Sequence, residues 1–554
     1  MHPSRSLIIC LFLICLCLTS VAADCPVPNL PRPTEDHAVI RARPEAQGLW
    51  KTTSDPALSP PDDPQLGDTW LWYVWNLGGF PTADLKPCTV RGVGEHCYVV
   101  VDDDEWLVSM DQADVDRIIE HFDETSVGTN PDLGIWDLNT GHFGDPPNPL
   151  DGLDRIFLFY YRFNISSDGY FWAFDQYPDG TQSFASNECE VVYLATDSGE
   201  PASDYMLAVA AHEFEHLIHY ARDENESAWV DEGLGELAMW LFGNPDTISG
   251  FNSNPDNSLL SWNSQWADYI KTYLWSLYCY EQYGGQPLIW DLVHNPANGL
   301  VGYQQALDGQ GHMVSTSDVF EDWSLANYLD DLSLAEGQFG YEGDDLPPFA
   351  NWLTVDTYPT SGAGSVQSHA TDYMRLVDLS TAVTVNIDGS EGAAWRVNFI
   401  AIDPVQPTLV IPMVLDAANE GSITLTEAVG YQEVVMAVAN VSPSSNGLYF
   451  FDIAQGTTSV PEIRVPQVAG HPNPFNPMAE LRFSLPVAGS AHLSIHAADG
   501  RLVRTLVEED LPSGEHVRAW NGRDDAGQGV ASGIYLVRLQ TNRGEARTKI
   551  TLVR

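Results

Sequence analysis

The sequence is poor in basic residues. Lysine and arginine together number 25 among 554 residues, against 77 aspartates and glutamates, so the formal net charge is −52. Only four residues are lysine. A surface of this charge repels the phosphates of nucleic acids and of anionic membranes, which excludes both as expected partners. We expect the charge mainly to keep the protein soluble, for instance in a salty medium.

Long hydrophobic runs are scarce as well. The run LIICLFLICLCL follows Arg5 and is about twelve residues long, which is too short to span a bilayer. It precedes small residues that end at Ala23, the pattern of a secretory signal peptide over residues 1–23. Asp24, directly before Cys25, argues against a lipoprotein signal. We therefore predict a secreted, extracellular protein without a transmembrane segment.

Cysteine is sparse, and five cysteines follow the predicted signal peptide: Cys25, Cys88, Cys97, Cys189 and Cys279. Exported proteins can hold disulfide bonds. Cys88 and Cys97 flank TVRGVGEH, a glycine-containing turn, so we expect a disulfide bond that closes a hairpin here. The alternative is that all five are buried apolar side chains.

The chain is too long for one hydrophobic core, which predicts a multidomain protein. Residues 24–66 are rich in proline and polar residues and are expected to form a leader or linker. Residues 67–345 mix short strands with amphipathic helices, typical of an α+β domain. Seven short apolar segments over residues 365–455 predict a β-sandwich. A polar linker, QGTTSVPE, leads to a second all-β domain over residues 466–554.

Three segments of the last domain can be compared with known families: HPNPFNP (471–477), ADGRLVRTLV (498–507) and WNGRDDAGQGVASGIYLVRL (520–539). In these it resembles the immunoglobulin-like (Ig-like) domain related to the flagellar hook-capping protein. It is also similar to the sorting domains of the type IX secretion route. The resemblance implies a bacterial origin, export, and a partner in the secretion machinery or at the cell surface. An inert spacer is the alternative.

One helix carries a candidate metal site. Ser203 or Asp204 can cap its start, and apolar residues follow at helical spacing up to Ile218. His212 and His216 are four residues apart and therefore project from one face, with Glu213 beside the first. This is the H-E-x-x-H pattern of two zinc ligands and a general base.

The third zinc ligand has several candidates. His219 lies about 10.5 Å along the helix from His212, too far to share one zinc ion, so we expect it to pack or to line the rim. Arg222 stands where the metzincin pattern needs histidine, which excludes that family. A second helix, predicted to start near Ser227, carries Glu232 and Glu236 on one face. A short loop lets this helix fold back onto the first.

The segment HEFEHLIHYARDENESAWVDEGLGELA (212–238) is similar to gluzincin metallopeptidases, and closest to secreted bacterial enzymes of the hyicolysin-like kind. Their second helix carries a W-x-N-E-G-x-x-E pattern, although Asp231 replaces the asparagine here. The resemblance implies a zincin-like fold and Glu213 as the general base. Glu236 becomes a partner of a ligand histidine, or the third ligand in place of Glu232. The implied ligands of one catalytic zinc ion are His212, His216 and Glu232.

The expected activity is hydrolysis of a protein or peptide substrate, with Glu213 as the base that takes a proton from a zinc-activated water. Tyr269 and Tyr273 are candidates to stabilise the oxyanion, or they only pack. No Gly-x-Met-Glu-Asn string is present, which favours an endopeptidase over an aminopeptidase. The alternatives are an inactive cell-surface binding or adhesion protein, and a zinc hydrolase of non-peptide amides. Calcium could bind Asp102–Asp104, but no EF-hand pattern is present.

Overall fold

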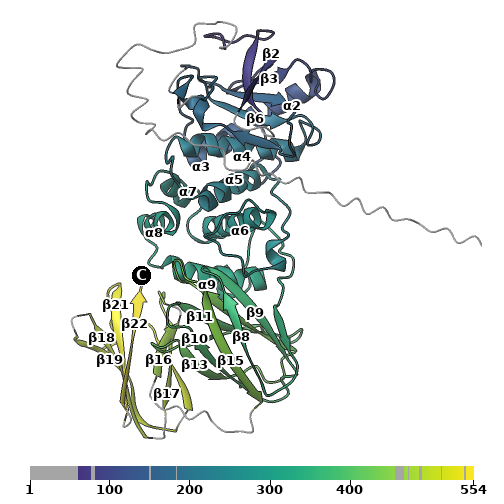
Figure 1. Ribbon diagram of the computed structural model, residues 1–554. Coiled ribbons are helices and arrows are strands. Elements are labelled where there is room, and N and C mark those ends of the chain that lie inside the picture. Colours follow the sequence, from purple (N-terminus) through teal and green to yellow (C-terminus); the bar gives the residue numbers. More distant parts are fainter. Residues whose placement is uncertain are drawn as a thin grey trace, which may run out of the picture.

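The structure is a computed structural model, in which the predicted signal peptide, Cys25 and nearly all of the predicted leader lie outside the described residues. No helix among the described residues is long and apolar enough to cross a membrane. The chain forms a mixed α/β region with helices, followed by several β-sheets, stacked along one elongated body (Figure 1). The structure describes residues 60–76, 82–148, 151–181, 184–455, 467–471, 473–485, 489–498, 500–512, 514–541 and 544–554.

A six-stranded sheet begins the fold, in the order β1-β2-β3-β4-β6-β5. β3, β4 and β6 are parallel and buried along their whole length, which fits apolar runs such as IFLFYY and means that both faces are covered. β5 runs antiparallel to β6 at one edge. The strands are β1 (Thr69–Trp75), β2 (Ala83–Val93), β3 (Cys97–Asp102), β4 (Ile156–Tyr161), β5 (Gly169–Phe171) and β6 (Val191–Ala195).

The predicted disulfide bond between Cys88 and Cys97 is wrong. TVRGVGEH is mostly strand, so Cys88 lies within β2 and pairs with Asp102, while Cys97 pairs with Ile156. The two thiols also lie in hydrophobic clusters on opposite faces of the sheet. All four cysteines of the described residues are buried, as the alternative expected, and Cys88 and Cys97 form no disulfide bond.

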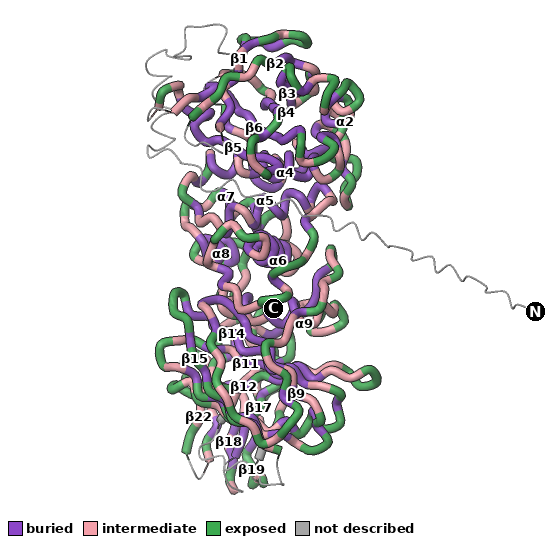
Figure 2. The backbone as a smooth tube through the Cα atoms, turned by 45° about the vertical axis from the view of Figure 1, so that its right-hand side comes forward, coloured by how far each residue is buried: buried purple, intermediate pink, exposed green. Residues whose placement is uncertain are grey.

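Helices form the layer below the sheet. Of the two predicted caps, Ser203 caps α4, because its side chain accepts a hydrogen bond from the Met206 N–H. Helix α4 contacts β5, β6 and α5, and α5 contacts α6. Figure 2 shows these three helices buried over most of their length. The helices are α2 (Gln112–Asp123), α3 (Ile135–Phe143), η1 (Ala173–Gln176), α4 (Asp204–Tyr220), α5 (Ala228–Phe242), η3 (Phe251–Ser253), α6 (Trp266–Gln282), α7 (Gln286–Val293), α8 (Gly299–Gly309), α9 (Thr316–Leu329) and η4 (Ala335–Gly337).

Two packed sheets follow, in the orders β13-β10-β15-β8 and β12-β11-β14-β9-β7. They begin before the predicted start at residue 365, because β7 ends and β8 begins before it. β8 has the sequence TSGAGSV and lacks large apolar residues, since its glycines face the rings of Phe451 and Tyr449 on β15. The strands are β7 (Leu353–Val355), β8 (Thr360–Val366), β9 (Ala370–Val377), β10 (Val383–Gly389), β11 (Trp395–Ile402), β12 (Leu409–Met413), β13 (Glu420–Thr424), β14 (Glu433–Asn440) and β15 (Gly447–Gln455).

The C-terminal segment forms two further sheets, β16-β17-β20 and β19-β18-β21-β22, around its own core. Trp520 and Phe483 are buried there together with Leu493 and Val537. The strands are β16 (Gln467–His471), β17 (Ala479–Leu485), β18 (Gly489–Ala497), β19 (Leu502–Leu511), β20 (Gly514–Trp520), β21 (Gly533–Thr541) and β22 (Gly544–Leu552).

Candidate metal centre

The candidate site lies between α4, which carries the two histidines, and α5, which carries the glutamates. Glycines let α5 approach its neighbours closely. A Cβ atom at Gly235 would lie 2.8 Å from the His212 ring, and one at Gly233 would lie 2.8 Å from the Thr272 carbonyl of α6. Any larger residue at these positions would push the helices apart, so the glycines fix the distance across the site.

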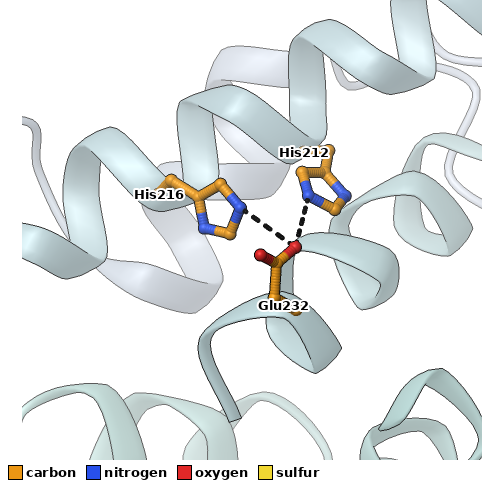
Figure 3. A group of neighbouring side chains, drawn as sticks. All are labelled: His212, His216 and Glu232. Atoms are coloured by element: carbon orange, nitrogen blue, oxygen red, sulfur yellow. Dashed lines mark ion pairs between the residues drawn. The ribbon is translucent and has the colours of Figure 1, made fainter. Parts of the chain in front are cut away.

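Three side chains converge at this point. His212 Nε2 lies 3.5 Å and His216 Nε2 lies 3.7 Å from Glu232 Oε2 (Figure 3). One ligand atom from each residue lies within 4.8 Å of the others. Ligands bound tetrahedrally at zinc distances are about 3.4 Å apart, and two imidazoles with one carboxylate form a common donor set for zinc. The residues therefore fit a zinc ion with a fourth position left over.

The two glutamates of α5 occupy different places. The Glu232 carboxylate lies with the Nε2 atoms, whereas Glu236 Oε1 lies 3.4 Å from Nδ1, on the other side of the His212 ring. A carboxylate in that place can fix the orientation of the ring by accepting a hydrogen bond from the Nδ1–H group. Glu236 is thus located as a partner of His212, and Glu232 as the residue that faces both histidines.

Glu213 lies beside the point where His212, His216 and Glu232 converge, but it neither faces the two Nε2 atoms nor contacts Nδ1 of His212. Only 3% of its surface is exposed, and a Cβ atom at Gly169 of β5 would lie 2.9 Å from its Cγ. The Phe171 N–H of β5 donates a hydrogen bond to its carboxylate. Burial nevertheless raises the pKa of Glu213 to about 7. A carboxyl group with a pKa near neutrality can both take and return a proton, as a general base must.

The two tyrosines proposed for the oxyanion have other contacts. Tyr273 is buried in α6, and its hydroxyl donates a hydrogen bond to Asp344. Tyr269 is also buried and packs edge-on against Trp262, with the ring centroids 4.7 Å apart. For Tyr269, the structure shows packing, which was the second of the two expectations.

Two residues of the acidic run at the end of β3 form ion pairs within the fold. Asp102 pairs with Lys86, with the Nζ and Oδ2 atoms 2.8 Å apart. Asp103 pairs with Arg91 at 2.9 Å and accepts a hydrogen bond from Thr89. Ion pairs therefore engage two of the three carboxylates considered for calcium.

His219 does not lie at a rim. It is 1% exposed, and its Nδ1 lies 3.1 Å from Glu215 and 3.3 Å from Asp231. The sequence pattern predicts no role for Glu215, and Asp231 stands out in it only because it replaces the asparagine of related enzymes. The Glu215–His219 spacing of four residues on one helix could have indicated this pair.

The histidines bind protons tightly when no metal is present. Burial by itself lowers the pKa of His212, but Glu232 and Glu236 raise it to about 10. Burial also lowers the pKa of His216, but Asp231, Glu215 and Glu232 raise it well above its ordinary value. Metal ions bind neutral imidazoles, so an ion bound here must displace these protons.

Binding of a divalent metal ion such as zinc at this site is therefore expected to strengthen as pH rises. Each displaced proton makes the affinity about tenfold higher per pH unit, so one or two protons give about 10- to 100-fold per unit between about pH 6 and 8. Calorimetric titration of the metal-free protein in buffers of different ionisation enthalpy measures the affinity and the proton release together. An affinity that stays constant over this pH range, without proton release, would contradict the prediction.

Comparison with known proteins identifies the C-terminal end. The FlgD Ig-like domain family matches residues 479–545, which confirms the prediction of an Ig-like domain there. No curated protein matches the chain.

Three solved structures are similar over parts of the chain. PorZ, a surface component of the type-IX secretion system of Porphyromonas gingivalis, is 16% identical over 28% of this chain and 22% of its own, with a TM-score of 0.13. Latent PorU of the same organism is 15% identical over 37% and 19%, with a TM-score of 0.18. A CARDB domain from Pyrococcus furiosus is 17% identical over 16% and 86%, with a TM-score of 0.12. The chain spans about a fifth of the length of PorZ and PorU.

Proposed function

We propose that the protein is a secreted zinc-dependent endopeptidase with a zincin-like catalytic domain. The observation that carries this proposal is the convergence of two imidazoles and the Glu232 carboxylate beside the buried carboxyl of Glu213. A decayed peptidase domain that served only for binding would be expected to have lost at least one of these four side chains.

In the proposed reaction, the zinc ion and the protein side chains have separate roles. Zinc held by His212, His216 and Glu232 would polarise the scissile carbonyl and make water more acidic. Glu213 takes the proton of the attacking water and passes it to the leaving amine. β5 holds Glu213 through the hydrogen bond from the Phe171 N–H to its carboxylate. In the described part of the chain, β5 is also the edge strand of the sheet and pairs with β6. Such an edge can pair with an extended peptide through main-chain hydrogen bonds.

Zinc quantification on the purified protein, together with casein hydrolysis in the presence and absence of a chelator, tests the proposal. We expect one zinc ion per chain, and hydrolysis that the chelator abolishes and added zinc restores. Protein that binds zinc but cleaves no peptide, while it releases small non-peptide amides, is instead a zinc amidase. Protein that binds no metal and cleaves nothing is a binding or adhesion protein.

The terminal Ig-like domain is expected to be dispensable for catalysis. It has its own core and contains none of the site residues, so a chain that ends at Gln455 should keep its zinc and keep hydrolysis within about threefold of the full chain. Its location in the host should change, because we propose that this domain meets secretion machinery or the cell surface. Casein hydrolysis and cell fractionation measure the two effects.

A longer deletion is the control. The sandwich shares a core with the helical region, in which Tyr373, Ile400 and Val435 pack with Phe320 and Trp323. Removing the sandwich should therefore destabilise the site. A folded, zinc-loaded chain that ends at Gln455 but has lost its activity would show that the terminal domain takes part in catalysis.

A further inference from the structure

Four side chains form a closed ring behind His216, on the side away from Glu232. Glu215 lies 3.1 Å from His216 Nδ1 through Oε2 and 3.1 Å from His219 Nδ1 through Oε1. Asp231 Oδ1 lies 3.4 Å from His216 Nδ1 and 3.3 Å from His219 Nδ1. Each of the two Nδ1 atoms therefore lies near both carboxylates, and each carboxylate lies near both imidazoles.

Water has little access to this ring. Glu215 is 0% exposed, His219 is 1% exposed and Asp231 is 7% exposed. In the part of the chain that the structure describes, Glu215 forms ion pairs only with the two histidines. A buried carboxylate is stable only when donors or positive charge face it, so Glu215 depends on these two rings.

The ring is connected to the metal centre through one imidazole. His216 presents Nε2 towards Glu232, which leaves Nδ1 to carry the proton and to face Glu215 and Asp231 at ion-pair distance. Without His219, both carboxylates would compete for this single N–H group. One of them would then have to turn away, and the plane of the His216 ring would no longer be fixed.

We infer that His219 is a positioning residue of the metal centre, which holds Glu215 and Asp231 so that they orient the His216 imidazole. This inference rests on the proposed zinc site, but it concerns a residue that does not itself reach the metal. It also assigns a purpose to Asp231: the carboxylate can bridge two imidazoles.

Three variants test the role of the His219 N–H group. His219→Leu removes the donor at similar volume, His219→Asn places an amide N–H near the position of Nδ1, and His219→Gln places it farther out. His142→Leu is the matched control, since His142 is a buried histidine whose ring nitrogens contact Leu138 O and the Tyr280 hydroxyl. Zinc and cobalt affinity are measured by competition with a chromophoric chelator, together with the visible spectrum of the cobalt form and thermal unfolding of the metal-free protein.

We expect His219→Leu and His219→Gln to weaken the binding of both metals about 10- to 100-fold and to alter the cobalt spectrum, whereas His219→Asn stays within about threefold of the native protein. His142→Leu should leave the affinity and the spectrum unchanged, even if it lowers the unfolding temperature. Native affinity in both His219→Leu and His219→Gln would overturn the inference, as would a loss no larger than that of the control. If His219→Leu does not fold, the comparison of His219→Gln with His219→Asn decides.

A double-mutant cycle with Asp231→Asn tests the coupling directly. Asparagine removes one of the two charges that His219 faces, so His219→Leu should cost at least about threefold less metal affinity in this background than in the native one. Equal costs in both backgrounds would overturn the inference. Native protein that binds neither zinc nor cobalt would refute the proposed function itself, whereas native protein that binds both, with unchanged His219 variants, refutes only the role of His219.

Discussion

Replacing Glu213 by glutamine is expected to lower casein hydrolysis at least about 100-fold while one zinc ion per chain remains bound. Glutamine has nearly the same shape, and both imidazoles and Glu232 are still present, so the metal affinity should not change greatly. The amide cannot accept the proton of the attacking water, so the proton transfer loses its base. Zinc content and initial rates on the same preparation measure both effects.

Glu281→Gln is the matched control for this substitution. Burial raises the pKa of Glu281 to about 7 as well, and its carboxylate accepts hydrogen bonds from the N–H groups of Glu342 and Gly343. The control therefore removes a half-buried carboxyl group with a similarly raised pKa that lies outside the proposed site, and its rate should remain near that of the native protein. A Glu213→Gln variant with activity within a few-fold of the native enzyme would remove Glu213 from the role of the base.

Substitution of the two glutamates of α5 should separate a ligand from its support. Glu232→Ala removes the carboxylate that faces both Nε2 atoms, so we expect the protein to lose its zinc or to bind it far more weakly. Glu236→Ala removes the carboxylate at His212 Nδ1 and should cost about 10- to 100-fold in zinc affinity or activity. Chelator competition gives both affinities on one scale.

The conservative variants serve as controls for these two alanines. Glu236→Gln keeps an acceptor oxygen near His212 Nδ1 and should recover most of the loss, whereas Glu232→Gln should not, because a neutral amide is a poor zinc ligand. The opposite order, in which Glu236→Ala strips the metal and Glu232→Ala retains it, would make Glu236 the third ligand. That result would revise the ligand set without removing the metal centre.

Much of the secondary structure near the site could be predicted from local pattern. A cap of α4 at Ser203 or Asp204 and a second helix starting near Ser227 both follow from the sequence, because capping and helical periodicity depend on residues within a few positions. β8 could not be predicted in this way. Gly362 and Gly364 look like turn residues, and only the aromatic rings on the neighbouring strand show why glycine is needed there.

The disulfide prediction failed for a related reason. The spacing of Cys88 and Cys97 fits a hairpin, but a strand has two faces, and the sequence does not state which face each thiol occupies. A single-residue bulge between Val90 and Gly92 also shifts the register of β2 against β3. Such shifts depend on packing against α2, where a Cβ atom at Gly92 would meet Val115 at 2.5 Å.

The sequence by itself determined that His212 and His216 share a face of the helix, with Glu213 directly after the first, because residues four apart on a helix share a face whatever the rest of the chain does. It left Glu232 and Glu236 as alternatives, since both lie on one face of α5. Only the tertiary structure located one at Nε2 and the other at Nδ1, because the position of α5 along α4 is set by how closely Gly233 and Gly235 let it approach α6 and His212. The ring of Glu215, His219 and Asp231 around His216 likewise exists only once the two helices have packed.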